Sequence, residues 1–162
     1  MRREEKVKLP SAPAIASLLT DLLGGRAKVE PGTKLGLNEN GFIGELLGPT
    51  GALLGLTFSD RAFAASSGAA LAMIPRGVAE DAVRKGVVPP NLLENHYEVV
   101  NVLTSALNAL HPSAQHVKLA KIHPTGPTLP APIRALWLKP PTRVDFVVEL
   151  TGYGTSRLTL VG

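Results

Sequence analysis

A long amphipathic segment, bounded by proline at both ends, is the feature that most constrains the fold of this chain. Pro89-Pro90 precede the segment and His111-Pro112 follow it, so a helix is predicted from about residue 91 to residue 110. Polar residues recur along it at steps of four, three, four and three, which places them in one stripe. The stripe consists of Glu94, Glu98, Asn101, Ser105 and Asn108. The other side is apolar, so this helix is predicted to lie on a hydrophobic core.

Shorter elements, separated by glycine and proline, are predicted before and after this helix. The chain contains 16 glycines and 14 prolines, which indicates many tight connections. Helical periodicity and caps predict further helices over residues 12–23, 59–74 and 78–85. Strands are expected over residues 28–31, 34–37, 42–47, 52–58, 116–122, 133–139, 143–151 and 156–161.

The order of these elements predicts an α+β fold, with helices packed against a mostly antiparallel sheet. A length of 162 residues suits one domain. We expect residues 1–10 to form a charged N-terminal tail and residues 11–162 to form a single domain. The last strand, 156–161, has few charges and is expected at a sheet edge. Pairing of such an edge with a second copy would give a homodimer.

Composition and charge exclude several classes of function. The chain has no cysteine, so it has no disulfide and no thiolate chemistry. Its net charge is +4, but the basic residues are scattered, which argues against a nucleic-acid partner. No apolar run is long enough to span a bilayer, so no membrane partner is expected. No apolar signal region follows the charged residues 1–8, which favours a cytoplasmic protein.

The four histidines do not form a predicted metal site. His96, His111, His116 and His123 lack the spacing of a ligand pair. We therefore interpret them as ordinary surface or turn residues and expect no metal.

The pair Glu98 and Asn101 is the candidate for chemistry. An acid and an amide three residues apart project side by side from one face of a helix. The acid can grip a cation while the amide orients a water, which suits hydrolysis of a phosphoryl group held on another protein. From periodicity alone, the same stripe is also explained as the solvated face of a surface helix.

The pattern E-x2-N-x22-P, formed by Glu98, Asn101 and Pro124, resembles the signature of the CheC/CheX/FliY family of phosphatases. These proteins act on the phosphorylated chemotaxis response regulator CheY. The family pattern has Asp or Ser four residues before the glutamate, where this chain has Glu94. The single copy of the motif and the chain length are most similar to the CheX type.

The resemblance implies a CheX-like fold and a role for each motif residue. Glu98 would pair with a lysine of the phosphorylated receiver domain, and Asn101 would orient the water that attacks the aspartyl phosphate. Glu94, Ser105 and Asn108 would contact the partner, and Pro124 would be structural. The chain would need no cofactor of its own, because the divalent cation, Mg²⁺, belongs to the receiver.

Two other functions remain open from the sequence. One is a CheX-like module that binds a receiver with weak catalysis or none. The other is an unrelated α+β domain that oligomerises through a sheet edge.

Overall fold

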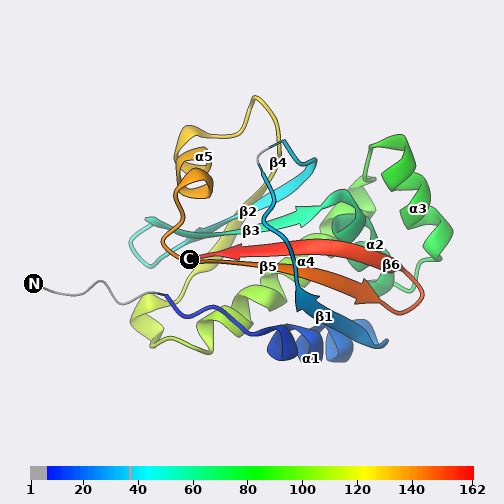
Figure 1. The fold of residues 1–162 in the computed structure, drawn as a ribbon, viewed down its shortest axis with the longest axis horizontal. Coiled ribbons are helices and arrows are strands. Elements are labelled where there is room, and N and C mark those ends of the chain that lie inside the picture. Colours follow the sequence, from blue (N-terminus) through cyan, green and yellow to red (C-terminus); the bar gives the residue numbers. More distant parts are fainter. Residues whose placement is uncertain (1–6, 37) are drawn as a thin grey trace, which may run out of the picture.

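In the computed structural model, one six-stranded antiparallel sheet carries helices on both faces (Figure 1). The structure describes residues 7–36 and 38–162. The strand order is β1-β5-β6-β3-β2-β4. The strands are β1 (Ala27–Pro31), β2 (Gly41–Leu47), β3 (Leu53–Asp60), β4 (Lys118–Pro124), β5 (Arg143–Leu150) and β6 (Gly154–Val161). The helices are α1 (Ala12–Leu23), α2 (Arg61–Leu71), α3 (Arg76–Lys85), α4 (Pro90–Asn108), η1 (Ser113–Gln115) and α5 (Ala131–Leu138). The predicted α+β class is confirmed.

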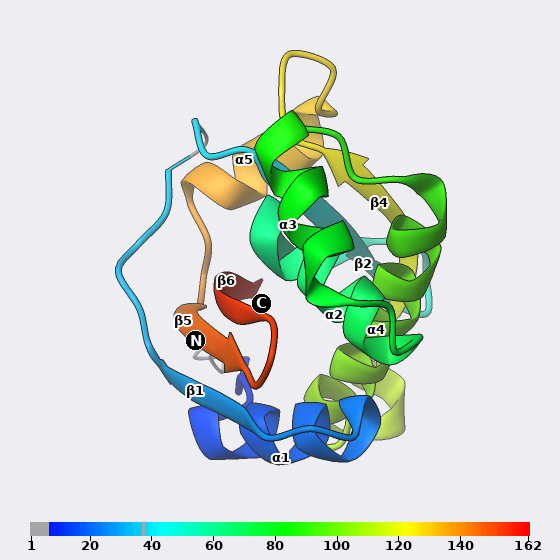
Figure 2. The same ribbon diagram turned by 90° about the vertical axis from the view of Figure 1, so that its right-hand side faces the viewer.

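The first face of the sheet is covered by α1, α2 and α4 (Figure 2). Alternate residues of β5 and β6 point into this layer because successive side chains of a strand face opposite ways. Phe146 and Val148 meet Ile15, Phe63 and Val99 there, and all five are buried. This core therefore joins the N-terminal helix, the two central helices and the last two strands.

Close contact between α2 and α4 depends on small residues. Gly68 of α2 lies against the backbone of α4, and a Cβ at this position would come within 2.2 Å of the carbonyl oxygen of Leu92. Ala65 and Ala69 are fully buried on the same helix. No larger residue fits at Gly68 without moving α4, so this packing fixes the position of the long helix over the sheet.

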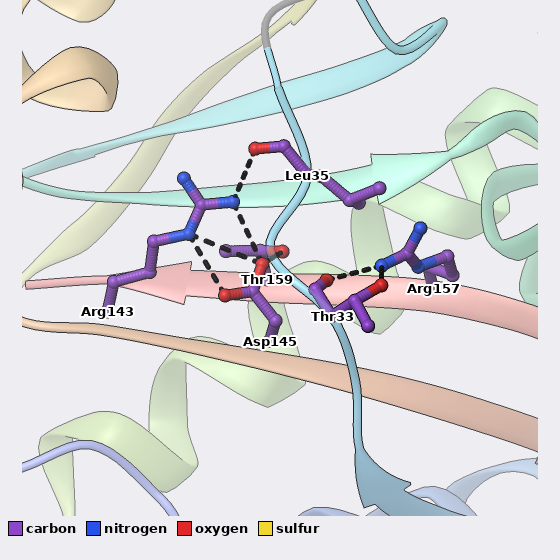
Figure 3. Close-up of polar contacts among 6 residues, drawn as sticks. All are labelled: Thr33, Leu35, Arg143, Asp145, Arg157 and Thr159. Atoms are coloured by element: carbon purple, nitrogen blue, oxygen red, sulfur yellow. Dashed lines mark hydrogen bonds and ion pairs between the residues drawn. The ribbon is translucent and has the colours of Figure 1, made fainter.

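The second face is covered by α5 and by the segment after β1. Trp137 of α5 packs against Phe58, with their ring centroids 5.3 Å apart. The Arg143 guanidinium lies 4.2 Å from the centroid of the Trp137 ring. Arg143 also pairs with Asp145 at 2.9 Å and donates to the carbonyl of Leu35 at 2.7 Å (Figure 3). Burial alone would raise the pKa of Asp145, but hydrogen bonds from Arg143 and Thr159 outweigh it and hold this pKa below its ordinary value. This network ties the connecting segment to the sheet.

Two predictions about the C-terminal third are wrong. Residues 131–138 form α5 rather than the strand expected over residues 133–139. Ile133 and Trp137, four residues apart, are the buried residues of this helix, which is helical spacing. The last strand, β6, lies between β5 and β3 instead of at an edge, so it is not available for pairing with another chain.

The sheet edges are instead β1 and β4. The strand expected over residues 34–37 is also absent from the described residues 34–36, and Leu37 lies outside the described residues. A homodimer through a sheet edge stays a prediction, and it would have to use β1 or β4.

The start of the described chain packs on the domain. Val7 and Leu9 lie against the core, and the carbonyl oxygen of Lys8 is 2.8 Å from Nε2 of His111. Residues 7–9 of the expected charged N-terminal tail therefore contact the domain, and residues 1–6 of that tail lie outside the described residues. Within the described part of the chain, no helix combines the length and the apolarity needed to cross a membrane.

Candidate functional site

The helix α4 presents the predicted polar stripe to solvent. Glu94, Glu98, Asn101 and Ser105 are exposed. The orientation follows from the apolar side of the helix, where Leu92, Val99 and Leu103 are buried. In the described part of the chain, the side chains of Glu98 and Asn101 make no hydrogen bond or ion pair, so both are available to a partner. Ser105 donates from its hydroxyl to the carbonyl of Val102 at 2.5 Å.

A buried polar contact joins α4 to α2 on the side of α4 that faces the core. Nδ1 of His96 lies 2.8 Å from the hydroxyl of Ser67 on α2, and the His96 ring packs edge-on against Phe63. Burial lowers the pKa of His96 to about 3, so the ring is neutral at physiological pH. The prediction of an ordinary surface or turn histidine is wrong for His96, because its position on α4 faces the core.

The amide of Asn95 adds a second contact between the same helices. Its Nδ2 donates to the carbonyl of Gly68 at 3.1 Å. Together with the close approach at Gly68, these contacts hold the segment of α4 that carries Glu94 and Glu98 against α2. The two carboxylates thus lie on a well-supported helix rather than on a loop.

Two side chains of α4 also bind the edge strand β4 and the residue before it. The Tyr97 hydroxyl donates to the carbonyl of Leu119 at 3.0 Å. Asn108 donates to the carbonyl of Val117 and accepts from its backbone N–H, both at 2.9 Å. The amide of Asn108 is therefore occupied within the domain, which differs from its predicted role as a partner contact. Glu98 and Asn101 lie on α4 between these two attachment points.

The edge strand carries a bulge beside the helix. Glu45 pairs with Lys121 and Leu46 pairs with Leu119, so Ala120 is an extra residue without a partner on β2. Bulges bend edge strands and interrupt regular pairing, which disfavours addition of another strand. On the same two strands, Nε2 of His123 lies 2.9 Å from Oε2 of Glu45.

An open groove of about 560 Å³ lies between α4 and β4 and brings part of the motif together. Glu94 and Glu98 line it from the helix, and Pro124, the last residue of β4, lines it from the strand. Asn101 lies about one turn further along α4, outside the lining. The remaining lining residues are Phe42, Leu93, Tyr97, Ala120, Lys121 and Ile122.

Sequence reasoning missed this groove and the residues that form its walls. Tyr97 could have been noticed because it falls between Glu94 and Glu98 on the same side of the helix. No local sequence pattern indicates that Phe42 and Ile122 line a groove, because their position depends on β2 and β4 lying beside α4.

The described residues offer no built metal site. No three histidine, aspartate or glutamate side chains among them come together as ligands would. The stripe offers carboxylates for a cationic group of a partner and an amide that can donate and accept at once.

No family model and no curated protein matches the sequence. Solved structures do match it. The FliM middle domain from Vibrio alginolyticus is 10% identical with a TM-score of 0.58, over 93% of this chain and 87% of that one. FliY from Thermotoga maritima is 14% identical with a TM-score of 0.51, over 91% and 81% of the two chains.

A third match bears on the resemblance seen in the sequence. CheX, in the CheX-CheY-BeF3-Mg²⁺ complex from Borrelia burgdorferi, is 15% identical with a TM-score of 0.52, over 91% of this chain and 92% of that one. The chain has the CheX/FliY/FliM fold. The expected CheX-like architecture is thereby confirmed, and the comparisons do not distinguish the CheX type from the others. At these identities the likeness concerns the fold alone.

Proposed function

We propose that this chain is a phosphatase that hydrolyses the aspartyl phosphate of a CheY-like receiver domain. The observation that carries the proposal is that Glu98 and Asn101 are exposed on one helix, α4, at the spacing of the family signature. The chain that carries them has the CheX/FliY/FliM fold. Pro124 supports it, because the residue that completes the signature lines the same groove as Glu98.

Each residue of the pair has a separate role in the proposal. Glu98 accepts an ion pair from the lysine of the receiver's active site and so docks α4 over the phosphoryl group. Asn101 enters beside the phosphoryl group, where its amide accepts a hydrogen bond from a water and donates one to a phosphoryl oxygen. An amide is better suited than a carboxylate, which would repel the negatively charged group.

The reaction needs positioning more than covalent help from the protein. The oriented water attacks phosphorus in line with the bond to the aspartate, that bond breaks, and inorganic phosphate leaves. The receiver's own Mg²⁺ offsets the negative charge, so the chain contributes no cofactor.

Release of phosphate from a phosphorylated receiver of the same genome tests the proposal. We expect the wild-type chain to accelerate release and Asn101→Ala to abolish most of the acceleration without loss of folding. Gln115→Ala is the matched control, because it removes an exposed amide on η1, beyond the end of α4. Acceleration by Asn101→Ala equal to that of the wild type would contradict the assignment.

A receiver-binding module without catalysis is the second candidate. Glu94 favours it, since the family pattern has Asp or Ser at that position. The fold also occurs in the FliM middle domain. Phosphorylation-dependent binding of a receiver with no change in its rate of dephosphorylation would identify this function.

A further inference from the structure

The groove between α4 and β4 combines an apolar floor with a charged rim. Phe42 and Ile122 from the sheet and Leu93 and Tyr97 from the helix supply the apolar surface. Its volume of about 560 Å³ admits one or two long side chains, and it is open to solvent at the surface. An open apolar floor of this kind is a place where a partner can bury a side chain.

Glu94 and Glu98 give one wall of the groove a negative charge that no ion pair among the described residues neutralises. The net charge is +4, and like charges four residues apart on a helix repel each other. Neither carboxylate forms an ion pair within residues 7–36 and 38–162, although Lys121 lines the opposite wall. Two unpaired carboxylates above an apolar floor suit a ligand that is apolar along its length and positive at its end.

We propose that the groove binds an arginine or lysine of the receiver, distinct from the active-site lysine, with its stem on the apolar floor and its charge on Glu94. This inference rests on the proposed function, in which Glu98 is engaged by the active-site lysine. Glu94 then determines which receivers the chain accepts, because only those with a basic residue at the facing position fill the groove. Glu94 lines the groove, and its side chain is one methylene longer than the Asp of the family pattern.

Binding to receivers activated with BeF3⁻ and Mg²⁺ provides a readout that does not depend on catalysis. For the receiver bound most tightly by the wild type, Glu94→Gln should raise Kd about twofold to fivefold, the range of an exposed charge pair. Glu94→Lys should raise it further, and high salt should reduce both differences. Glu149→Gln is the matched control, because it removes an exposed carboxylate from β5, on the sheet face opposite α4, and should leave Kd unchanged.

A charge exchange identifies the facing residue. Each exposed arginine and lysine of the receiver, except the active-site lysine, is changed to glutamate and tested against Glu94→Lys. Restoration of binding by one receiver variant, and by no other, is the expected result. In the phosphatase assay, Glu94→Gln should raise KM and leave kcat unchanged.

The outcomes separate this inference from the proposed function. Unchanged Kd for both Glu94 variants, with activity lost in Asn101→Ala, would overturn the role of the groove and leave the phosphatase standing. A fall in kcat without a change in KM would also overturn it, since Glu94 would then act on the chemistry. Failure of the wild-type chain to bind any receiver would overturn both proposals.

Discussion

The hydroxyl of Tyr97 donates a 3.0 Å hydrogen bond to the carbonyl oxygen of Leu119, and so joins the long helix to the edge strand beside the bulge. Tyr97 precedes Glu98 directly, and Leu119 precedes Ala120, the unpaired residue of β4. This hydrogen bond therefore fixes the distance between the two walls of the groove, next to the residues proposed to contact the receiver.

Removal of this hydroxyl should loosen β4. Tyr97→Phe is expected to lower the free energy of unfolding by about 1 kcal/mol, the usual net contribution of one hydrogen bond, and to speed amide exchange in β4. Tyr153→Phe is the matched control, because its hydroxyl donates to the carbonyl of Ile74 at 2.6 Å and not to a residue of β4. Equal exchange in β4 for the two variants would show that Tyr97 does not hold the strand.

Asn101→Asp tests the need for an amide with almost no change in shape. The variant should lose dephosphorylation as completely as Asn101→Ala, because the added charge repels the phosphoryl group. Since Asn101 is exposed and makes no hydrogen bond to the described residues, stability should change by less than about 0.5 kcal/mol. Phosphate release and denaturant unfolding measure the two effects; an active Asn101→Asp would argue against the proposed role.

Asn108 should prove structural rather than a partner contact. Asn108→Ala removes two hydrogen bonds to Val117 and is expected to cost about 2 kcal/mol of stability. Ser105→Ala, on the same stripe, should cost less than about 0.5 kcal/mol, because Ser105 is exposed and bonds only to its own helix. Equal losses in denaturant unfolding would contradict this distinction.

The α2–α4 contact should tolerate no added methyl group. Gly68→Ala is expected to destabilise the chain by about 1–3 kcal/mol, because the new Cβ would overlap the carbonyl oxygen of Leu92. Gly77→Ala in α3 provides the comparison, since nothing lies within 4 Å of its Cβ position. That variant should be neutral or slightly more stable.

Acid should destabilise the fold through His96. Its pKa is about 3 in the folded chain and near 6.5 when unfolded, so the unfolded state binds the proton more tightly. The stability contributed by neutral His96 is complete above about pH 6.5 and is lost as the pH falls toward 3. At pH 5 the loss amounts to about 2 kcal/mol.

Denaturant unfolding of the wild type and of His96→Gln between pH 7 and pH 5 measures this effect. The other three histidines are present in both proteins, so their contributions cancel in the comparison. The variant should be less stable at pH 7 but should lose less stability on acidification. Parallel curves would show that His96 is not the group responsible.

Local patterns predicted the elements whose signal lies in consecutive residues. The long helix was expected over 91–110 and spans Pro90–Asn108, because proline limits it and its apolar side is continuous. The strands expected over residues 42–47 and 52–58 correspond to β2 (Gly41–Leu47) and β3 (Leu53–Asp60). In contrast, the short apolar run at residues 133–139 is also typical of a strand, so the sequence alone does not indicate α5.

Properties that depend on the assembled sheet were not predictable in this way. The interior position of β6 is set by its pairing with β5 and β3, and neither partner is encoded in residues 154–161. The orientation of His96 could have been found, since it lies four residues after Leu92 and three before Val99 on the buried side. The exposure of Glu98 and Asn101 was predicted correctly, whereas the groove beside them required knowledge that β4 lies next to α4.

The central position of β6 has a consequence for synthesis of the chain. Among the described residues, the β1–β5 pair and the β3–β2–β4 unit are joined in the sheet only through this strand, which follows the other five strands along the chain. Until β6 emerges, β3 has one unpaired edge and the apolar residues of α1, α2 and α4 lack part of their core. Such surfaces attract other nascent chains. The yield of native protein should therefore depend on how quickly β6 is translated and on chaperones that bind the incomplete sheet.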